Sequence, residues 1–217
     1  MTLGVNREER FAAVAKCSLF HGLDRLAQER IAVLATSRRY PPGSTLFSRG
    51  EAGGPLLLIE SGMVCLSLFS DEGKELVVDI AGRGDTVGEL SFADGDRRET
   101  SCIALESVRV VSIARHGLPM SVESNLNDYL SALLYRRLRE TVVLIEELAL
   151  CSLEARLIRR LQHFDKRTSV RLSRLGQGVL AMLVNASRPK LNRQLHRLQK
   201  VGVIDLNKGA IVEVHNI

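Results

Sequence analysis

The chain has 217 residues, of which 45% are hydrophobic and 25% are charged, values typical of a globular protein. Its apolar runs are shorter than the ~18 residues that a membrane helix needs, and the charged start MTLGVNREER lacks the apolar region of a secretory signal. These features exclude a membrane partner and predict a cytoplasmic protein.

The charge of +5 is unevenly distributed along the chain. Residues 151–217 contain 13 Lys or Arg against 4 Asp or Glu, whereas residues 1–150 contain 17 against 21. A basic C-terminal segment on a mildly acidic body indicates two domains with different partners, and a polyanion suits the basic one. Charge alone leaves a merely solvated basic surface as an alternative.

Four cysteines (Cys17, Cys65, Cys102 and Cys151) lie far apart and form no C-x-x-C pair. This spacing predicts reduced thiols and argues against a zinc or iron–sulfur site. Because free cysteines are usually buried, we expect four structural thiols, with Cys17 the most exposed of them.

The first half of the chain changes character at about residue 38. Residues 6–37 carry apolar side chains at helical spacing, which predicts short amphipathic helices. Residues 38–113 contain short runs rich in Val, Ile, Leu and Thr, separated by turn signals such as RGEAGG and SDEGK. Many short, closely spaced strands bounded by glycine predict an antiparallel β roll.

Residues 120–150 contain neither Gly nor Pro and predict one long helix. An apolar seam at heptad spacing favours a partner helix of the same kind. The seam residues are Leu134, Leu138, Thr141, Ile145 and Leu148. The alternative is that the seam packs against the chain's own β roll. Other apolar residues of the helix lie off the seam, so the helix can contact both a partner helix and the roll. We therefore expect a parallel homodimer through this helix.

The basic end contains a recognisable order of elements. After a helix at 153–164, the segment RTSVRLSR (167–174) predicts a short strand, and residues 177–184 predict a short helix. Asn185 suits a tight turn, Ser187 is a good N-cap for the next helix, and Pro189 fits its first turn.

Three leucines form the buried stripe predicted for that next helix: Leu191, Leu195 and Leu198. The segments VGVIDL and AIVEV around the turn NKG predict a two-stranded wing. Helix, turn, capped helix and hairpin is the order of a winged helix-turn-helix. An ordinary helical hairpin with solvated charge is the alternative.

These elements together resemble the CRP/FNR family of bacterial transcription regulators. Three stretches carry the resemblance, which extends from about residue 18 to the C-terminus: RRYPPGSTLFSRGEAGGPLLLIESGMVCLS, DEGKELVVDIAGRGDTVGEL and NASRPKLNRQLHRLQKVGVI. The resemblance implies an α+β fold with an antiparallel, jelly-roll-like β-roll sensor domain (1–118), a dimerisation helix (119–151) and a winged helix-turn-helix DNA-binding domain (152–217). It implies a homodimer on a two-fold symmetric operator of double-stranded DNA, with RNA polymerase as a further candidate partner.

The family's DNA contacts carry over to the second helix of this motif. Arg188 and Arg193 fall on base-reading and phosphate-reading arginines, and Ser187 falls on a phosphate contact. Arg188, bidentate to a guanine, would supply ~1–3 kcal/mol of discrimination. Pro189 replaces an acidic base-reading residue of many members, so their operator sequence is not assumed. The predicted DNA-binding residues are Gln177, Ser187, Arg188, Lys190, Asn192, Arg193 and His196.

In cyclic-AMP-binding members, the loop that GELSFADGDRRET resembles holds the cyclic phosphate. Alignment on Ala104 places Arg98 at the phosphate arginine but Glu99 at a Ser or Thr position; a shift by one residue places Glu99 at the arginine instead. A carboxylate ~4 Å from a phosphate costs on the order of 1 kcal/mol in water and about 4 at an effective dielectric of 20. We therefore do not expect ordinary cyclic AMP as the effector; a different small ligand, or none, is the remaining possibility. The predicted pocket comprises Gly88, Glu89, Leu90, Arg98, Glu99, Thr100 and Thr141.

Two other readings keep the same fold: a transcription activator gated by cyclic AMP or cyclic GMP, and a cyclic-nucleotide-binding regulatory subunit that acts on a protein partner. The basic, wing-bearing end argues against the second. An enzyme of the cupin type would need His and carboxylate ligands inside the roll. The five histidines all lie outside residues 40–115: His21, His116, His163, His196 and His215. We predict no catalytic residue, no metal, and no certain cofactor beyond a small effector such as a cyclic nucleotide.

Overall fold

The computed structural model describes residues 7–17, 20, 22–116, 118, 120–207 and 209–215, without the side chains of residues 120–126, 129 and 212. The chain divides into two compact units, Met1–Leu66 with Ile80–Arg139 and Ser67–Asp79 with Glu140–Ile217. Each unit has its own buried core. No helix within the described residues is long and apolar enough to cross a membrane.

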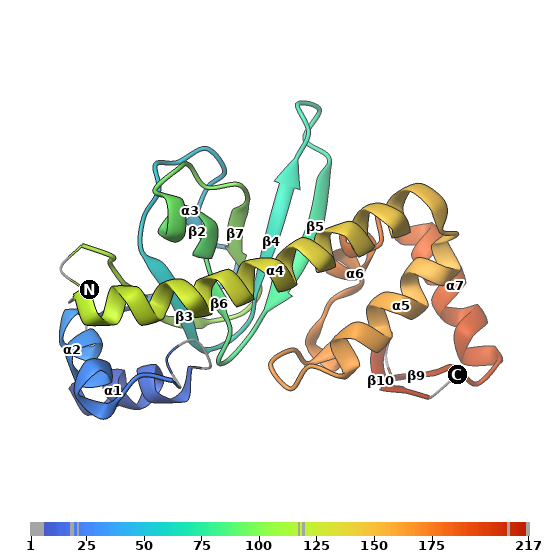
Figure 1. The fold of residues 1–217 in the computed structure, drawn as a ribbon. Coiled ribbons are helices and arrows are strands. Elements are labelled where there is room, and N and C mark those ends of the chain that lie inside the picture. Colours follow the sequence, from blue (N-terminus) through green and yellow to red (C-terminus); the bar gives the residue numbers. More distant parts are fainter. Residues whose placement is uncertain are drawn as a thin grey trace. The chain divides into compact units, whose positions relative to one another are not determined.

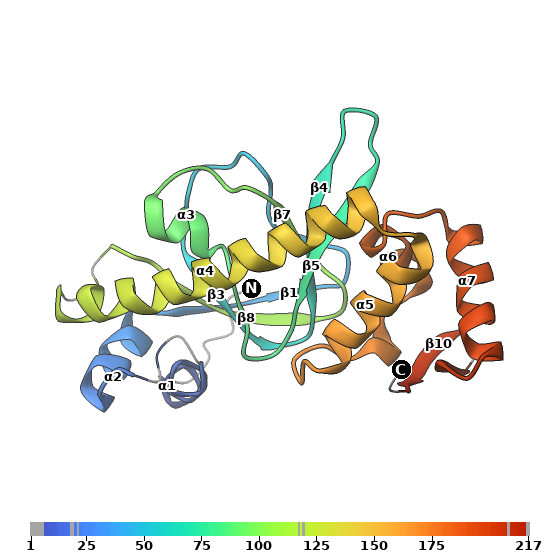
Figure 2. The same ribbon diagram turned by 45° about the vertical axis from the view of Figure 1, so that its right-hand side comes forward.

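The first unit contains two helices and most of a β roll, whereas residues 67–79 of the roll belong to the second unit (Figures 1 and 2). Helix α2 (Arg25–Leu34) follows α1 (Arg7–Lys16) and begins at Asp24, whose Oδ1 accepts a hydrogen bond from the Ala27 amide at 2.7 Å. The roll contains β1 (Thr36–Tyr40), β2 (Thr45–Phe47), β3 (Leu56–Ser61), β4 (Val64–Phe69), β5 (Glu75–Ala81), β6 (Thr86–Val87), β7 (Ser101–Ala104) and β8 (Val108–Ile113).

The strands form two four-stranded sheets in the orders β1-β8-β3-β6 and β2-β7-β4-β5. β8 pairs antiparallel with both β1 and β3, and β7 pairs antiparallel with β2. This arrangement confirms the predicted antiparallel roll. A short helix, α3 (Glu89–Asp94), interrupts the roll immediately after β6.

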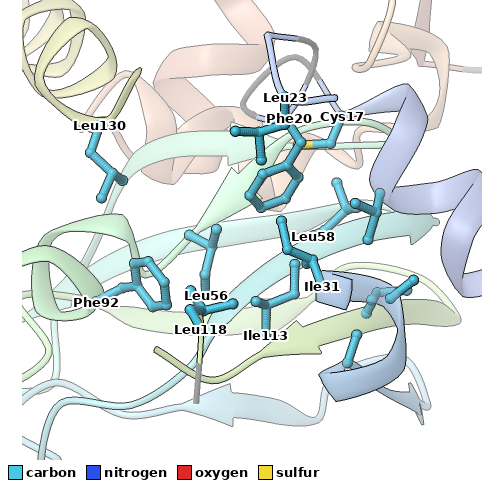
Figure 3. Packing of buried hydrophobic residues seen from close by; sticks show 14 residues of the cluster. Cys17, Phe20, Leu23, Ile31, Leu56, Leu58, Phe92, Ile113, Leu118 and Leu130 are labelled. Carbon is cyan, nitrogen blue, oxygen red and sulfur yellow. The ribbon is translucent and has the colours of Figure 1, made fainter. Parts of the chain in front are cut away.

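A single apolar cluster joins the N-terminal helices, the roll, α3 and the start of α4 (Met120–Leu150). In Figure 3 the Phe92 ring projects from α3 toward Leu56 and Leu118. Leu130 of α4 belongs to the same cluster. Burial of these side chains anchors α3 to the core, because each fully buried large apolar side chain contributes ~1.5–3 kcal/mol.

Cys17 was predicted to be the most exposed thiol, and this prediction is wrong. Cys17 is buried in the apolar cluster, and Cys151 is instead the more exposed cysteine. The turn after α1 carries the thiol inward next to Phe20, whose amide donates a hydrogen bond to the Cys17 carbonyl at 3.0 Å. A small apolar side chain gains from such a position.

The long helix α4 has 31 residues and ends where the sequence predicts. Two seam residues, Leu138 and Ile145, remain 63% and 60% exposed, whereas Leu130 and Leu144 are buried. Thr141 is exposed, and Leu134 and Leu148 are half-buried. The seam therefore leaves two apolar side chains, Leu138 and Ile145, largely exposed in the single chain.

The second unit contains α5 (Leu153–Asp165), the 3-10 turn η2 (Leu172–Arg174), α6 (Gln177–Leu183), α7 (Arg188–Lys200), β9 (Ile204–Asn207) and β10 (Ala210–Val214). β9 and β10 form the predicted antiparallel wing. α7 contacts α5, α6 and β9 (Figures 1 and 2). The helix, turn, helix and wing predicted from the sequence are all present.

The strand predicted within RTSVRLSR is wrong, because this segment forms turns and η2 instead. The amides of Val170, Arg174 and Leu175 each donate to the carbonyl three residues earlier. Val170 and Leu172 are buried. Their two-residue spacing imitates a strand, but the backbone satisfies its hydrogen bonds locally.

Candidate nucleic-acid interface and effector loop

The turn between α6 and α7 sets the geometry of the helix pair. Asn185 is the only described non-glycine residue with a positive φ, of 50°, as predicted from its tolerance of the left-handed region. The Ala186 amide donates to the Ala181 carbonyl at 2.9 Å and closes the turn. α7 then begins at the N-cap Ser187, with Pro189 in its first turn.

One face of α7 is buried and the other is exposed. The predicted leucine stripe is confirmed, since Leu191, Leu195 and Leu198 are all at most 1% exposed. Ser187 makes no side-chain capping hydrogen bond, which leaves its hydroxyl available for a ligand. The exposed residues of α7 and its N-cap include Ser187, Arg188, Lys190, Arg193 and His196.

Two predicted DNA-binding residues, Asn192 and Gln177, do not belong to the exposed residues of α7. Asn192 is half-buried, and its Oδ1 is buried without a hydrogen-bond partner among the described residues. Gln177 lies at the start of α6 and donates from Nε2 to the Gly209 carbonyl in the wing turn at 3.2 Å. Gln177 therefore ties the wing to α6 in this structure.

Sequence reasoning missed Gly178, which lies directly after Gln177. A Cβ at this position would lie 2.6 Å from Nη2 of Arg188, so the arginine side chain crosses the glycine backbone. The available signal was a glycine inside a predicted helix, which is unfavourable unless packing requires it.

The candidate effector loop, residues 88–100, begins at Gly88, which is the N-cap of α3 and has a left-handed φ of 81°. Six of the seven predicted pocket residues lie in the first unit. Glu89, Arg98 and Thr100 are buried, Glu99 is half-buried and Leu90 is 39% exposed. Thr141 lies on α4 in the second unit.

The Arg98 guanidinium already has partners from three segments of the first unit. Its Nη1 donates to Ser91 Oγ at 2.6 Å and to the Gly88 carbonyl at 3.0 Å, and its Nη2 donates to the Pro55 carbonyl at 2.8 Å. The guanidinium also lies over the Phe47 ring, 4.4 Å from its centroid. Burial lowers the pKa of Arg98, and the carboxylate of Glu99 opposes that shift. In this structure the guanidinium of Arg98 therefore ties Ser91, Gly88 and Pro55 together.

The two glutamates of the loop behave differently. Glu89 forms an ion pair with Arg137 of α4, with 2.8 Å between Oε1 and Nε. Burial is the main cause that raises the pKa of Glu99. Three oxygens have no hydrogen-bond partner among the described residues although they are buried: Glu89 Oε2, Glu99 Oε2 and Thr100 Oγ1. The Thr100 hydroxyl can donate or accept a hydrogen bond, but ionised carboxylates only accept, so Glu89 and Glu99 do not supply the donors that a phosphate would require.

Gly88→Ala is expected to lower the free energy of unfolding by more than the ~1–2 kcal/mol of left-handed strain, because its Cβ would also collide with Nη1 of Arg98. Gly73→Ala is the matched control, since Gly73 has a φ of 77° and nothing within 4 Å of its Cβ. Urea unfolding of both variants measures the difference. Equal losses in the two variants would contradict a role of Gly88 in accommodating Arg98.

Two family models match the chain. The cyclic nucleotide-binding domain matches residues 37–124, and the Crp-like helix-turn-helix domain matches residues 155–217. These matches cover the β roll with its effector loop and the basic helix-turn-helix unit.

Full-length relatives agree with both matches. The cyclic AMP receptor protein of Thermus thermophilus is 30% identical over 200 residues, which cover 89% of this chain and 90% of that protein. The CRP-like protein Clp of Xanthomonas campestris is 28% identical over 207 residues, which cover 88% and 89% of the two chains.

Solved structures share the arrangement of elements. The c-di-GMP responsive global regulator CLP of Xanthomonas campestris superposes with a TM-score of 0.74 at 25% identity, over 89% of this chain and 100% of that chain. FixK2 of Bradyrhizobium japonicum superposes with a TM-score of 0.75 at 17% identity, over 84% and 93% of the two chains. The β roll, the long helix and the basic helix-turn-helix thus occur together in related regulators, and this chain belongs to the CRP/FNR family of transcription regulators.

Proposed function

We propose that this regulator acts as a homodimer that places its two α7 helices in successive major grooves of a two-fold symmetric operator. The exposed row on α7, which includes Arg188, Lys190 and Arg193, carries this proposal. The buried stripe of Leu191, Leu195 and Leu198 packs one side of α7 against the rest of the helix-turn-helix and therefore fixes which side of α7 faces outward. Basic side chains on such a helix suit phosphates and guanine edges.

The proposal assigns one role to each part of the chain. Residues 1–118 form the sensor domain, residues 119–151 the dimerisation helix and residues 152–217 the DNA-binding domain. RNA polymerase is a candidate protein partner of the DNA-bound dimer, and the cytoplasm is the expected location.

Selection of duplexes from a random library, followed by titration of the selected operator, tests the DNA proposal. We expect a two-fold symmetric site and an affinity that falls steeply with salt. Arg188→Ala is expected to lower operator affinity by about 5- to 100-fold and to relax one base position, whereas Lys190→Ala lowers affinity uniformly across sequences. Failure to select any duplex would favour the regulatory subunit that acts on a protein partner.

The roll belongs to a cyclic nucleotide-binding domain, which indicates a small-molecule effector. We propose that this effector is not ordinary cyclic AMP. The Arg98 donors are engaged by Ser91, Gly88 and Pro55, and the alignment on Ala104 puts Glu99 at the position of the hydroxyl that meets the phosphate. The unsatisfied carboxylate oxygens of Glu89 and Glu99 instead suit a ligand that donates hydrogen bonds.

A guanine-containing cyclic dinucleotide fits these acceptors, because the guanine edge presents N–H donors. The structural neighbour CLP is described as responsive to c-di-GMP, which supports testing this ligand first. Cyclic AMP is the second candidate, since the Thermus relative is a cyclic AMP receptor protein.

Thermal unfolding of the purified protein with 1 mM cyclic AMP, cyclic GMP or cyclic di-GMP separates these candidates. We expect a shift with cyclic di-GMP, since binding at 100 times the Kd stabilises the fold by ~2.7 kcal/mol, and none with cyclic AMP. Glu99→Ser is expected to gain a shift with cyclic AMP, because it removes a carboxylate and supplies a hydroxyl. A clear cyclic AMP shift in the unmodified protein would support the second candidate instead.

A further inference from the structure

Gly178 occupies a position where the backbone gives no reason for glycine. It is the second residue of α6, and its φ is not positive. Glycine inside a helix is ~1 kcal/mol less favourable than alanine. A packing requirement is therefore needed to explain this residue.

The requirement comes from Arg188, the first residue of α7. A Cβ on Gly178 would lie 2.6 Å from Nη2, 3.2 Å from Cζ and 3.3 Å from Nε of Arg188. Three atoms of the guanidinium group thus lie over the glycine, in space that any other side chain would occupy.

Contact with Gly178 is the main restraint on this arginine. Arg188 is exposed, and within the described ranges its guanidinium has neither an ion pair nor a hydrogen bond. A free arginine side chain has ~2 kcal/mol of rotamer entropy to lose when it is immobilised. A guanidinium already held over a backbone loses less of that freedom on binding.

We propose that Gly178 is a positioning residue that sets how Arg188 reads its base. This inference rests on the proposed DNA-binding function, in which Arg188 enters the major groove. Gly178 itself lies outside α7, so it influences recognition from the first helix of the motif.

Gly178→Ala tests the proposal because its effects on folding and on recognition are expected to differ. The free energy of unfolding should stay the same or rise, since alanine favours the helix and the flexible arginine can move aside. Operator affinity should fall about 5- to 10-fold, with relaxed preference at the base that Arg188 reads. Affinity for random-sequence duplex should stay unchanged.

Gly176→Ala is the matched control. Gly176 is the N-cap of α6 with φ of −66° and ψ of 151°, and nothing lies within 4 Å of its Cβ. The same glycine-to-alanine change two residues away should therefore leave base preference intact.

A double-mutant cycle with Arg188→Ala completes the test. In the Arg188→Ala background, Gly178→Ala should have no further effect on operator affinity. The proposal is overturned by an equal loss in both backgrounds, by unchanged base preference in Gly178→Ala, or by an increase in affinity. Absence of operator binding by the unmodified protein would instead overturn the proposed function itself.

Discussion

Glutamate at both Leu138 and Ile145 is expected to convert the protein to monomers and to lower operator affinity about 100-fold or more, because two half-sites no longer bind as one unit. These side chains are 63% and 60% exposed in the single chain and lie on one heptad seam of α4. Heptad-spaced apolar residues bury themselves against a partner helix, and two carboxylates in that position would repel each other across the dimer. Light scattering coupled to size-exclusion chromatography measures the mass, and operator titration measures the affinity.

Arg139→Glu is the control for this double variant. Arg139 is exposed on the same helix, next in sequence to Leu138 but turned away from the seam. A glutamate there adds the same charge outside the expected interface, so the variant should remain dimeric. A Leu138→Glu/Ile145→Glu protein that stays dimeric and binds its operator normally would contradict dimerisation through this seam.

Glu147→Ala is expected to lower the free energy of unfolding by ~3–5 kcal/mol, the loss that follows when one partner of a buried ion pair is removed. Glu147 Oε2 lies 2.7 Å from Nε of Arg160, and the two side chains are only 5% and 8% exposed. The pair joins the end of α4 to α5 across the break between these helices. Its loss leaves the Arg160 charge buried without compensation.

The neighbouring residue provides a matched control for that prediction. Glu146 pairs with Arg159 at 3.0 Å, but these side chains are 49% and 45% exposed. Glu146→Ala should therefore cost only ~0–1 kcal/mol. Urea unfolding compares the two variants. A combined Glu147→Leu/Arg160→Met variant should recover most of the lost free energy of unfolding, since apolar pairs replace buried ion pairs well. Similar losses in Glu147→Ala and Glu146→Ala would show that burial does not determine how much these ion pairs stabilise the fold.

Local chemistry made most of the fold predictable from the sequence. The leucines of α7 repeat at helical spacing, Asn185 is one of few residues that tolerate its turn, and glycines mark the corners of the roll. Such signals act within a few residues of the chain. They therefore identified α6, α7, the wing and the strands without knowledge of distant contacts.

The failures concern contacts that the local sequence pattern does not specify. The alternation of Val170 and Leu172 imitated a strand, because local spacing does not reveal whether a partner strand exists. Burial of Cys17 depends on how α1 and α2 pack on the roll. The partners of Arg98 include Pro55, 43 residues away, and the contact of Gly178 with Arg188 arises only when the two helices meet.

The tie that Arg98 forms has a consequence for how effector specificity changes during evolution. Its guanidinium holds Pro55, Gly88 and Ser91 together in this structure. Selection for a stable fold alone is therefore enough to retain this arginine. Glu99 Oε2 and Thr100 Oγ1 take no part in that tie, since neither oxygen has a hydrogen-bond partner among the described residues. The presence of an arginine at this place in the loop therefore has a structural explanation that does not require phosphate binding.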